Sequence, residues 1–306
     1  MYPSGRSPVV LARELIAMGY SHDELARLTR RDDLVHLRRG AYSWASGQAL
    51  EAADQHLMLV RATVPLVSGE AVVSHCSAAV LHELPVWGDR LTRVHVTRTS
   101  GSGKRRGKLH VHAAPLAADE IVVVSGIRTT STSRTVVDLA RSLPYEQAVA
   151  AGDAAVRAGC RRDHIAGSLE LARGRPGVAA ARRVVEFVDG RSESPGESLS
   201  RVVLSRLGLP APQLQYAVLD DGLLVGRTDF CWEEQRTLGE FDGKVKYGRL
   251  VKEGETAADA VYREKRREDA LRDLGWQVVR WSWGDLKAPR VLGDRLTRAF
   301  SRGRTP

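Results

Sequence analysis

The sequence predicts a mixed α/β protein of the α+β class with more than one domain. Stretches with apolar residues three and four positions apart, typical of helices, are interspersed with short alternating stretches typical of strands. A chain of 306 residues with 43% hydrophobic and 27% charged residues is long enough for two or three buried cores. The polar segment "DGRSESPGES" predicts the main boundary. The expected domains are residues 1–48, 49–190 and 191–306.

The charge balance favours an anionic partner such as nucleic acid. Lys and Arg number 46 against 37 Asp and Glu, which gives a net charge of +9. The alternative is that the basic excess only serves solubility. Cys76, Cys160 and Cys231 lie far apart without a CxxC pair, so neither a zinc site nor a disulfide framework is indicated. No apolar run of about 18 residues and no signal-like start is present. We therefore expect a cytoplasmic protein without a membrane partner.

The first domain is expected to contain two short helices and a hairpin. Residues 8–18 and 21–30 have helical periodicity, and Ser21 followed by Glu24 is a capping box. The alternating stretch "DLVHLRRGAYSW" turns at Gly40 and predicts a β-hairpin. This order is that of a winged-helix unit, although any surface helix pair can carry arginines. The candidate DNA phosphate contacts are Arg27, Arg30, Arg31, Arg38 and Arg39.

The middle region combines helices with strands at "RVHVTR" and "KLHVHAA". His75 and His82 lie on one helical face, but no third ligand follows at helical metal-site spacing, so packing or capping is the expected role. The join "TSGSGKRRGK" contains Gly103-Lys104 without the rest of a phosphate-binding P-loop. A flexible basic loop is expected instead. Its side chains available for backbone phosphates, or merely for water, are Lys104, Arg105, Arg106 and Lys108.

From residue 196 onward the pattern predicts the order α-β-β-β-α-β around a mixed sheet. Asp229 lies near the end of the second strand and Glu240 near the end of the third, so both carboxylates would face one cleft if these strands pair. Neighbouring carboxylates repel each other, which favours a divalent cation between them. Oxygen-only ligands indicate Mg²⁺ or Mn²⁺, which would bind a phosphodiester oxygen and activate a water. Glu197 would add a third carboxylate. The basic residues expected to hold the DNA backbone from the second helix are Arg263, Lys265, Arg266 and Arg267.

A family resemblance is carried by Glu197, Asp229, Glu240-Phe241-Asp242-Gly243, Glu264-x-x-Arg267 and Leu271-x-x-x-Gly275-Trp276. These residues resemble the PD-(D/E)XK nuclease superfamily, especially the branch similar to the very-short-patch repair endonucleases. The resemblance implies a restriction-endonuclease-like core in which Asp229 and Glu240 bind the metal. The superfamily has Lys two places after the Glu, where this chain has Asp242. The role of that lysine, which is to position the attacking water, would then pass to Lys244 or Lys246. Alternatively, Asp242 would be another metal ligand.

The N-terminal half carries a second resemblance. The segments "LVHLRRGAYS", "VVSHCSAAVLHELPV" and "TSTSRTVVDLAR" are similar to the AbiEi family of bacterial type IV toxin–antitoxin antitoxins. This resemblance implies a winged helix that binds promoter DNA and a nucleotidyltransferase-like toxin as partner.

The two halves together predict a bacterial DNA-binding protein with a Mg²⁺-dependent endonuclease-like domain. One alternative is a non-catalytic autoregulator that binds operator DNA and a toxin and has a degenerate nuclease fold. Others are a protein–protein adaptor, and a solvated strand edge whose alternating charges have no site role. Trp276, Trp281 and Trp283 would form either a stacking platform for bases or, as we expect, packing at the core and sheet end.

Overall fold

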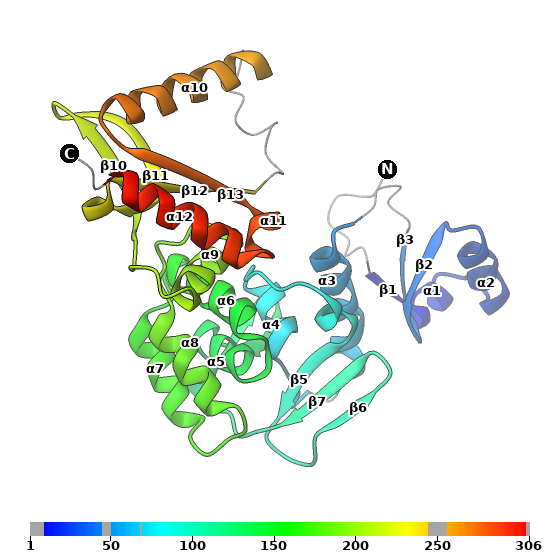
Figure 1. Cartoon of the computed structure of the whole chain (residues 1–306). Coiled ribbons are helices and arrows are strands. Elements are labelled where there is room, and N and C mark those ends of the chain that lie inside the picture. The colour runs from blue at the N-terminus through cyan, green and yellow to red at the C-terminus, as the bar shows by residue number, and fades with distance from the viewer. Residues whose placement is uncertain (1–8, 45–49, 68, 244–255, 304–306) are drawn as a thin grey trace. The chain divides into compact units, whose positions relative to one another are not determined.

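The computed structural model describes residues 9–44, 50–67, 69–243 and 256–303 (Figure 1). The chain forms two compact units. Unit 1 comprises residues 1–155 and 159–187, and unit 2 comprises residues 156–158 and 188–306. Both mix helices with strands, as the sequence predicts. No helix among the described residues combines the length and apolar character needed to cross a bilayer.

Unit 1 begins with two helices beside a small antiparallel sheet. In chain order the elements are β1 (Val9–Leu11), α1 (Ala12–Ala17), α2 (His22–Arg30), β2 (Leu34–Arg38) and β3 (Ala41–Trp44). The strand order is β1-β3-β2. The predicted capping box is confirmed, because Ser21 N donates to Glu24 Oε2 and Glu24 N donates to Ser21 Oγ. Residues 9–11, expected to be helical, form a strand instead, because their backbone pairs with β3.

A six-stranded mixed sheet follows in unit 1, in the order β6-β7-β5-β4-β9-β8. Its strands are β4 (Val72–Val73), β5 (Val94–Arg98), β6 (Lys104–Arg106), β7 (Leu109–Ala113), β8 (Ile121–Val124) and β9 (Ile127–Thr130). β5 and β7 run parallel, so the expected loop between them is a crossover. That loop is partly a strand: Lys104, Arg105 and Arg106 form edge strand β6, paired with β7. Three exposed charges suit an edge, where strands are protected from further pairing by charge.

Helices complete unit 1. They are α3 (Ala52–Thr63), α4 (His75–Leu81), α5 (Thr132–Ser142), α6 (Tyr145–Arg157), α7 (Arg162–Leu171) and α8 (Val178–Phe187). α5 is buried over most of its length and contacts α4, α7 and α8. His82, which follows the last residue of α4, makes a 2.7 Å hydrogen bond through Nε2 to the Thr130 carbonyl, so the expected packing role is confirmed for this histidine.

Unit 2 follows the predicted order of elements closely. They are α9 (Pro195–Arg206), β10 (Gln213–Asp220), β11 (Leu223–Trp232), β12 (Thr237–Asp242), α10 (Ala257–Asp273), β13 (Gln277–Ser282), α11 (Trp283–Leu286) and α12 (Pro289–Gly303). The sheet order is β10-β11-β12-β13. The first three strands are antiparallel, and β13 joins β12 in parallel. A parallel neighbour requires a crossover, which α10 supplies.

The packing of unit 2 explains the burial of two tryptophans and the need for one glycine. Trp281 is buried, and its indole Nε1 donates a 2.7 Å hydrogen bond to Ser200 Oγ on α9. A Cβ on Gly239 would lie 2.5 Å from the Trp281 ring, so glycine is required at this place in β12. Trp276 is also buried, under the Arg236 guanidinium. The expected packing role is therefore confirmed for these two tryptophans, whereas Trp283 is 39% exposed.

Candidate functional sites

Unit 2 gathers the acids that the sequence singled out. The last registered pair of β11 and β12 is Phe230 with Gly239, and continuing this register places Asp229 opposite Glu240. Asp229 Oδ2 accepts a 2.8 Å hydrogen bond from the backbone N–H of Phe241. Glu197 enters from the first turn of α9. Three elements far apart in the sequence thus direct carboxylates to one region.

Within the described ranges, Asp229 has no cationic partner. Burial, and next the negative charge of Glu197, raise its pKa to about 7, while the hydrogen bond from Phe241 opposes this shift. Glu240 and Glu193 add further repulsion. No ion pair to Asp229 occurs among the described residues. Near neutral pH the ionised Asp229 carboxylate is therefore repelled by the neighbouring acids. A bound cation would offset this repulsion.

Glu197 is held by hydrogen bonds at the start of α9. Its Oε2 accepts from the backbone N–H of Glu193 and from Gln215 Nε2, both at 2.8 Å. Its Oε1 accepts from Ser194 Oγ at 2.7 Å. These three donors are neutral, so they orient the Glu197 carboxylate without supplying an opposite charge.

Glu240 is neutralised by two arginines. Its Oε1 lies 2.5 Å from Arg267 Nη2 on α10, and its Oε2 lies 3.0 Å from Arg280 Nε on β13, although that N–H does not have hydrogen-bond geometry. Glu264 pairs with both arginines, and Glu268 with Arg280. Within the described part of the chain, the acids of unit 2 do not form a group of three ligand atoms close enough to share one ion.

The remaining predicted residues of unit 2 are dispersed. Asp242 is exposed at the end of β12, and Lys265 and Arg266 are exposed on α10. Arg263 is half-buried, and Arg267 is occupied by Glu240 and Glu264 rather than directed to solvent. Lys244 and Lys246 lie outside the described residues.

The basic residues of unit 1 stand mostly in solvent. Arg27 and Arg30 are exposed on α2, and Arg31 is exposed just after it. In the hairpin, Arg39 is exposed, whereas Arg38 is half-buried and its pKa is lowered by burial. The guanidinium atoms Nε and Nη1 of Arg38 are buried without a hydrogen-bond partner among the described residues. The five phosphate contacts predicted for α2 and the hairpin therefore include four exposed cations and the half-buried Arg38.

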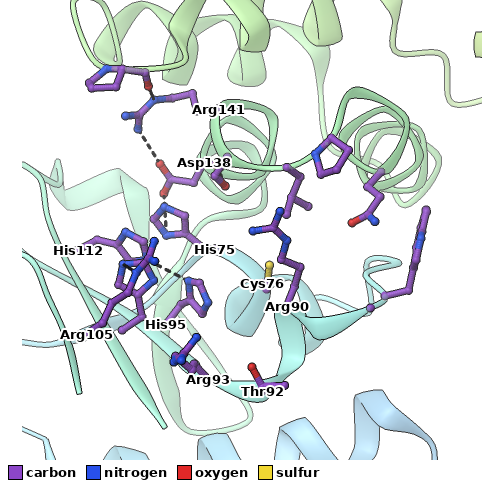
Figure 2. Close-up of a pocket in the computed structure, with 18 residues that line it drawn as sticks. His75, Cys76, Arg90, Thr92, Arg93, His95, Arg105, His112, Asp138 and Arg141 are labelled. Atoms are coloured by element: carbon purple, nitrogen blue, oxygen red, sulfur yellow. Dashed lines mark hydrogen bonds and ion pairs between the residues drawn. The ribbon is translucent and has the colours of Figure 1, made fainter. Parts of the chain in front are cut away.

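Unit 1 contains a pocket that the sequence did not predict. It has a volume of about 650 Å³ and brings histidines together with arginines and the carboxylate of Asp138 (Figure 2). His95 comes from β5, His112 from β7, and His75 from the first position of α4. Each of these three offers one ring nitrogen, and the three nitrogens lie within 4.8 Å of one another. His75, for which a packing or capping role was expected, is one of these three.

The histidine rings are in close contact. His95 Nδ1 lies 3.0 Å from His112 Nε2, and the rings of His75 and His112 stack with centroids 3.7 Å apart. Burial lowers the pKa of His75 to about 3, with further lowering by the charges of Arg134 and Arg141. Burial and the neighbouring His75 lower the pKa values of His95 and His112 to about 2. The imidazoles are therefore neutral at physiological pH.

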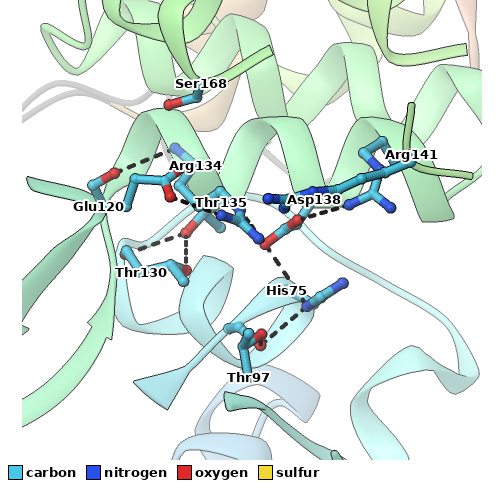
Figure 3. A network of polar contacts seen from close by, with 12 residues as sticks. His75, Thr97, Glu120, Thr130, Arg134, Thr135, Asp138, Arg141 and Ser168 are labelled. Carbon is cyan, nitrogen blue, oxygen red and sulfur yellow. Dashed lines mark hydrogen bonds and ion pairs between the residues drawn. The ribbon is translucent and has the colours of Figure 1, made fainter. Parts of the chain in front are cut away.

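A buried ionic network lies behind His75 (Figure 3). Asp138 on α5 is fully buried and accepts hydrogen bonds from Arg134 Nε at 3.0 Å and from Arg141 Nη1 at 3.3 Å. Arg134 Nη1 also donates to Glu120 Oε2 at 2.9 Å. Asp138 Oδ2 lies 4.0 Å from His75 Nδ1, so the network adjoins the histidines through Asp138.

Comparison with known proteins yields relatives without a stated activity. No protein-family model matches the chain. The uncharacterized Mycobacterium tuberculosis proteins MT2308 and Rv2248 are each 36% identical to it over 183 residues, which are 59% of this chain. The matched part spans 65% of the length of these relatives. The crystal structure of the RV2827C protein from Mycobacterium tuberculosis aligns with a TM-score of 0.40 and 17% identity, over 64% of this chain and 76% of that chain.

Proposed function

We propose that the protein binds DNA and that unit 2 hydrolyses phosphodiester bonds with Mg²⁺ or Mn²⁺. The observation that carries this proposal is the convergence of Glu197, Asp229 and Glu240 on a sheet bounded by α9 and α10, where burial and neighbouring acids raise the pKa of Asp229 to about 7. A buried carboxylate with a pKa near neutrality is a candidate for a functional group. The α-β-β-β-α-β order and the PD-(D/E)XK resemblance support the same function.

The donor set fits a divalent cation in part. Asp229 and Glu197 provide oxygen ligands, the type that Mg²⁺ prefers. Glu240 fits once its carboxylate leaves Arg267 or Arg280. A bound ion would stabilise negative charge on a phosphodiester and lower the pKa of a nearby water. Hydrogen bonds within the chain orient these two ligands. Phe241 N–H orients Asp229, and Gln215 orients Glu197.

Cleavage of plasmid and short duplex DNA tests the catalytic part. We expect the full chain to cut DNA in the presence of Mg²⁺ or Mn²⁺, and Asp229→Ala and Glu240→Ala to remove the cutting. Glu170→Ala is the matched control, because it removes an exposed acid of unit 1 that pairs only at the surface. Cutting that survives in Asp229→Ala would show that the acids of unit 2 do not perform the reaction.

A second candidate function is supported by the ion pairs of Glu240. A glutamate held by both Arg267 and Arg280 resembles a structural network more than a vacant metal ligand. On this alternative the protein is a non-catalytic regulator that binds operator DNA, with a nucleotidyltransferase-like toxin as the partner implied by the AbiEi resemblance. DNA binding without cutting on any substrate would favour it.

DNA contact in both candidates is assigned to residues 9–44, interpreted as a winged helix. We expect Arg27→Ala and Arg39→Ala each to weaken binding to all sequences similarly and to reduce the salt dependence of log K by about 1. Arg173→Ala, an exposed arginine on another part of unit 1, should leave both quantities unchanged. Mobility shifts over a series of salt concentrations measure the slope. An unaltered slope in the first two variants would refute this assignment.

A further inference from the structure

We propose that His75, His95 and His112 bind one transition-metal ion of the Zn²⁺ class, with one coordination position open to the pocket of unit 1. This site is separate from the proposed cation site of unit 2. It shares no residue with that site, and its chemistry is nitrogen-based rather than oxygen-based.

The spacing of the ring nitrogens agrees with metal coordination. Two nitrogens bound to one tetrahedral Zn²⁺ at 2.0–2.1 Å are roughly 3.3 Å apart. His95 Nδ1 and His112 Nε2 are 3.0 Å apart, and the nitrogen of His75 lies within 4.8 Å of both. The His75 ring stacks on the His112 ring with an interplanar angle of 12°, so coordination of a shared ion requires the His75 ring to turn out of this stack. No other group of three such side chains was found in the described ranges.

The backbone holds the three histidines independently of one another. His95 and His112 stand on β5 and β7, which pair in parallel inside the six-stranded sheet. His75 has φ of +51°, in the left-handed region that residues other than glycine rarely adopt. Such strain tends to persist where the surrounding structure requires a particular side-chain position. Here it directs an imidazole toward the two strands.

Outer contacts orient His75 as they do for many metal-bound histidines. Its Nδ1 lies 3.0 Å from Ser74 Oγ, which in turn accepts a hydrogen bond from Thr97 Oγ1 at 2.8 Å. Asp138 Oδ2 is 4.0 Å from the same nitrogen. A hydroxyl or carboxylate at Nδ1 fixes the tautomer and leaves Nε2 as the ligand atom. Figure 2 shows His75 between Asp138 and the other two histidines, and Figure 3 shows it between Asp138 and Thr97.

The chemistry favours zinc and a ligand of negative charge. Neutral imidazoles suit Zn²⁺ and Co²⁺ more than Mg²⁺ or Ca²⁺. Three protein ligands with an open fourth position are typical of metal sites that bind water or substrate. The residues that line the pocket beside the histidines include Arg90, Arg93, Arg105 and Arg141. Water or an anion such as phosphate is therefore the expected fourth ligand.

Equilibrium dialysis with metal analysis tests the site. The full chain, without a histidine tag and stripped with a chelator, should bind one Zn²⁺ tightly. His95→Ala and His112→Ala should weaken this binding at least about 100-fold, since the loss of an outer-shell partner alone costs about 10–100-fold. His112→Gln provides a variant that retains side-chain bulk. Circular dichroism and thermal melting establish that each variant is folded.

Matched controls separate the site from adventitious binding. His110 lies on the same strand as His112 but outside the group of three. The His110→Ala variant should therefore still bind one Zn²⁺. Asp229→Ala should do so as well, because its carboxylate belongs to unit 2. No tight Zn²⁺ binding by the full chain, or an equal loss in His110→Ala and His112→Ala, would overturn the proposal.

Cobalt reports the ligand type. Co²⁺ in the full chain should give the visible absorption of a tetrahedral site, and inorganic phosphate should change that spectrum if it occupies the open position. Cys76 also lines the pocket, but burial raises the pKa of its thiol to about 11. An intense thiolate-to-cobalt band would overturn the three-histidine ligand set.

Discussion

Replacement of Asp138 by Ala is expected to lower the free energy of unfolding of unit 1 by about 3–5 kcal/mol. The Asp138 carboxylate is fully buried between Arg134 and Arg141. Arg134 is itself 1% exposed, so the variant would leave a buried guanidinium with Glu120 as its remaining acid. The cost of an incompletely paired buried charge exceeds the modest value of the pair itself. Hydrogen exchange of α5 and β9 peptides measures the effect in unit 1 alone.

Two further variants make this result interpretable. Asp138→Asn retains the volume and one acceptor, so it should lose less stability than Asp138→Ala. Glu170→Ala removes an ion pair with Arg173 whose side chains are 56% and 77% exposed, and should cost no more than about 0.5 kcal/mol. A loss below about 1 kcal/mol for Asp138→Ala would mean that the network is hydrated rather than buried.

The sequence predicted unit 2 better than unit 1 because the elements of unit 2 carry their own patterns. β11 is ten residues long and β10 is eight, long enough for strand character to be evident, and α10 shows an uninterrupted helical stretch of 17 residues. The edge strand β6 was missed because a run of three basic residues carries no apolar alternation. Its backbone pairing with β7 determines its conformation, which local sequence does not show.

The histidine group was missed for a related reason. His75, His95 and His112 are separated by about 20 residues each, without the short spacing of a helical metal site. Only the parallel pairing of β5 with β7 and the left-handed backbone at His75 bring them together. A weak signal was present in "HVH", because alternate residues of a strand share a face. The ion pairs of Glu240 could not be predicted for the same reason, because its arginine partners come from α10 and β13.

Asp229→Asn is expected to make unit 2 more stable at high pH and to abolish part of its pH dependence. The pKa of Asp229 is about 7 in the folded chain and near 4 for an exposed aspartate. Because the folded pKa is raised, the stabilising contribution of the protonated carboxyl is complete below about pH 4 and is lost as pH rises through 7. Asparagine retains an acceptor for Phe241 N–H and carries no charge.

The size of the effect follows from the pKa shift. A shift of three units corresponds to about 4 kcal/mol, and partial contact of the carboxyl with water reduces this to about 2 kcal/mol. At pH 8 with a chelator present, the variant should exceed the natural protein by this amount, and at pH 4 the difference should vanish. Urea unfolding followed by tryptophan fluorescence is suitable, since four of the six tryptophans belong to unit 2. Asp220→Asn, which removes an exposed acid from β10, should change stability by less than about 0.5 kcal/mol at either pH.

Adding Mg²⁺ to the same experiment distinguishes the two candidate functions. An ion that binds Asp229 and Glu197 favours the ionised carboxylate, so it should restore stability to the natural protein at pH 8 and leave Asp229→Asn unchanged. A regulator without a cation site would show the pH effect of Asp229 but no response to Mg²⁺ in either protein. An equal response in both proteins would place the Mg²⁺ site away from Asp229. The Mg²⁺ dependence of the unfolding free energy at pH 8, where Asp229 is charged, thus reports cation binding even where no substrate is cut.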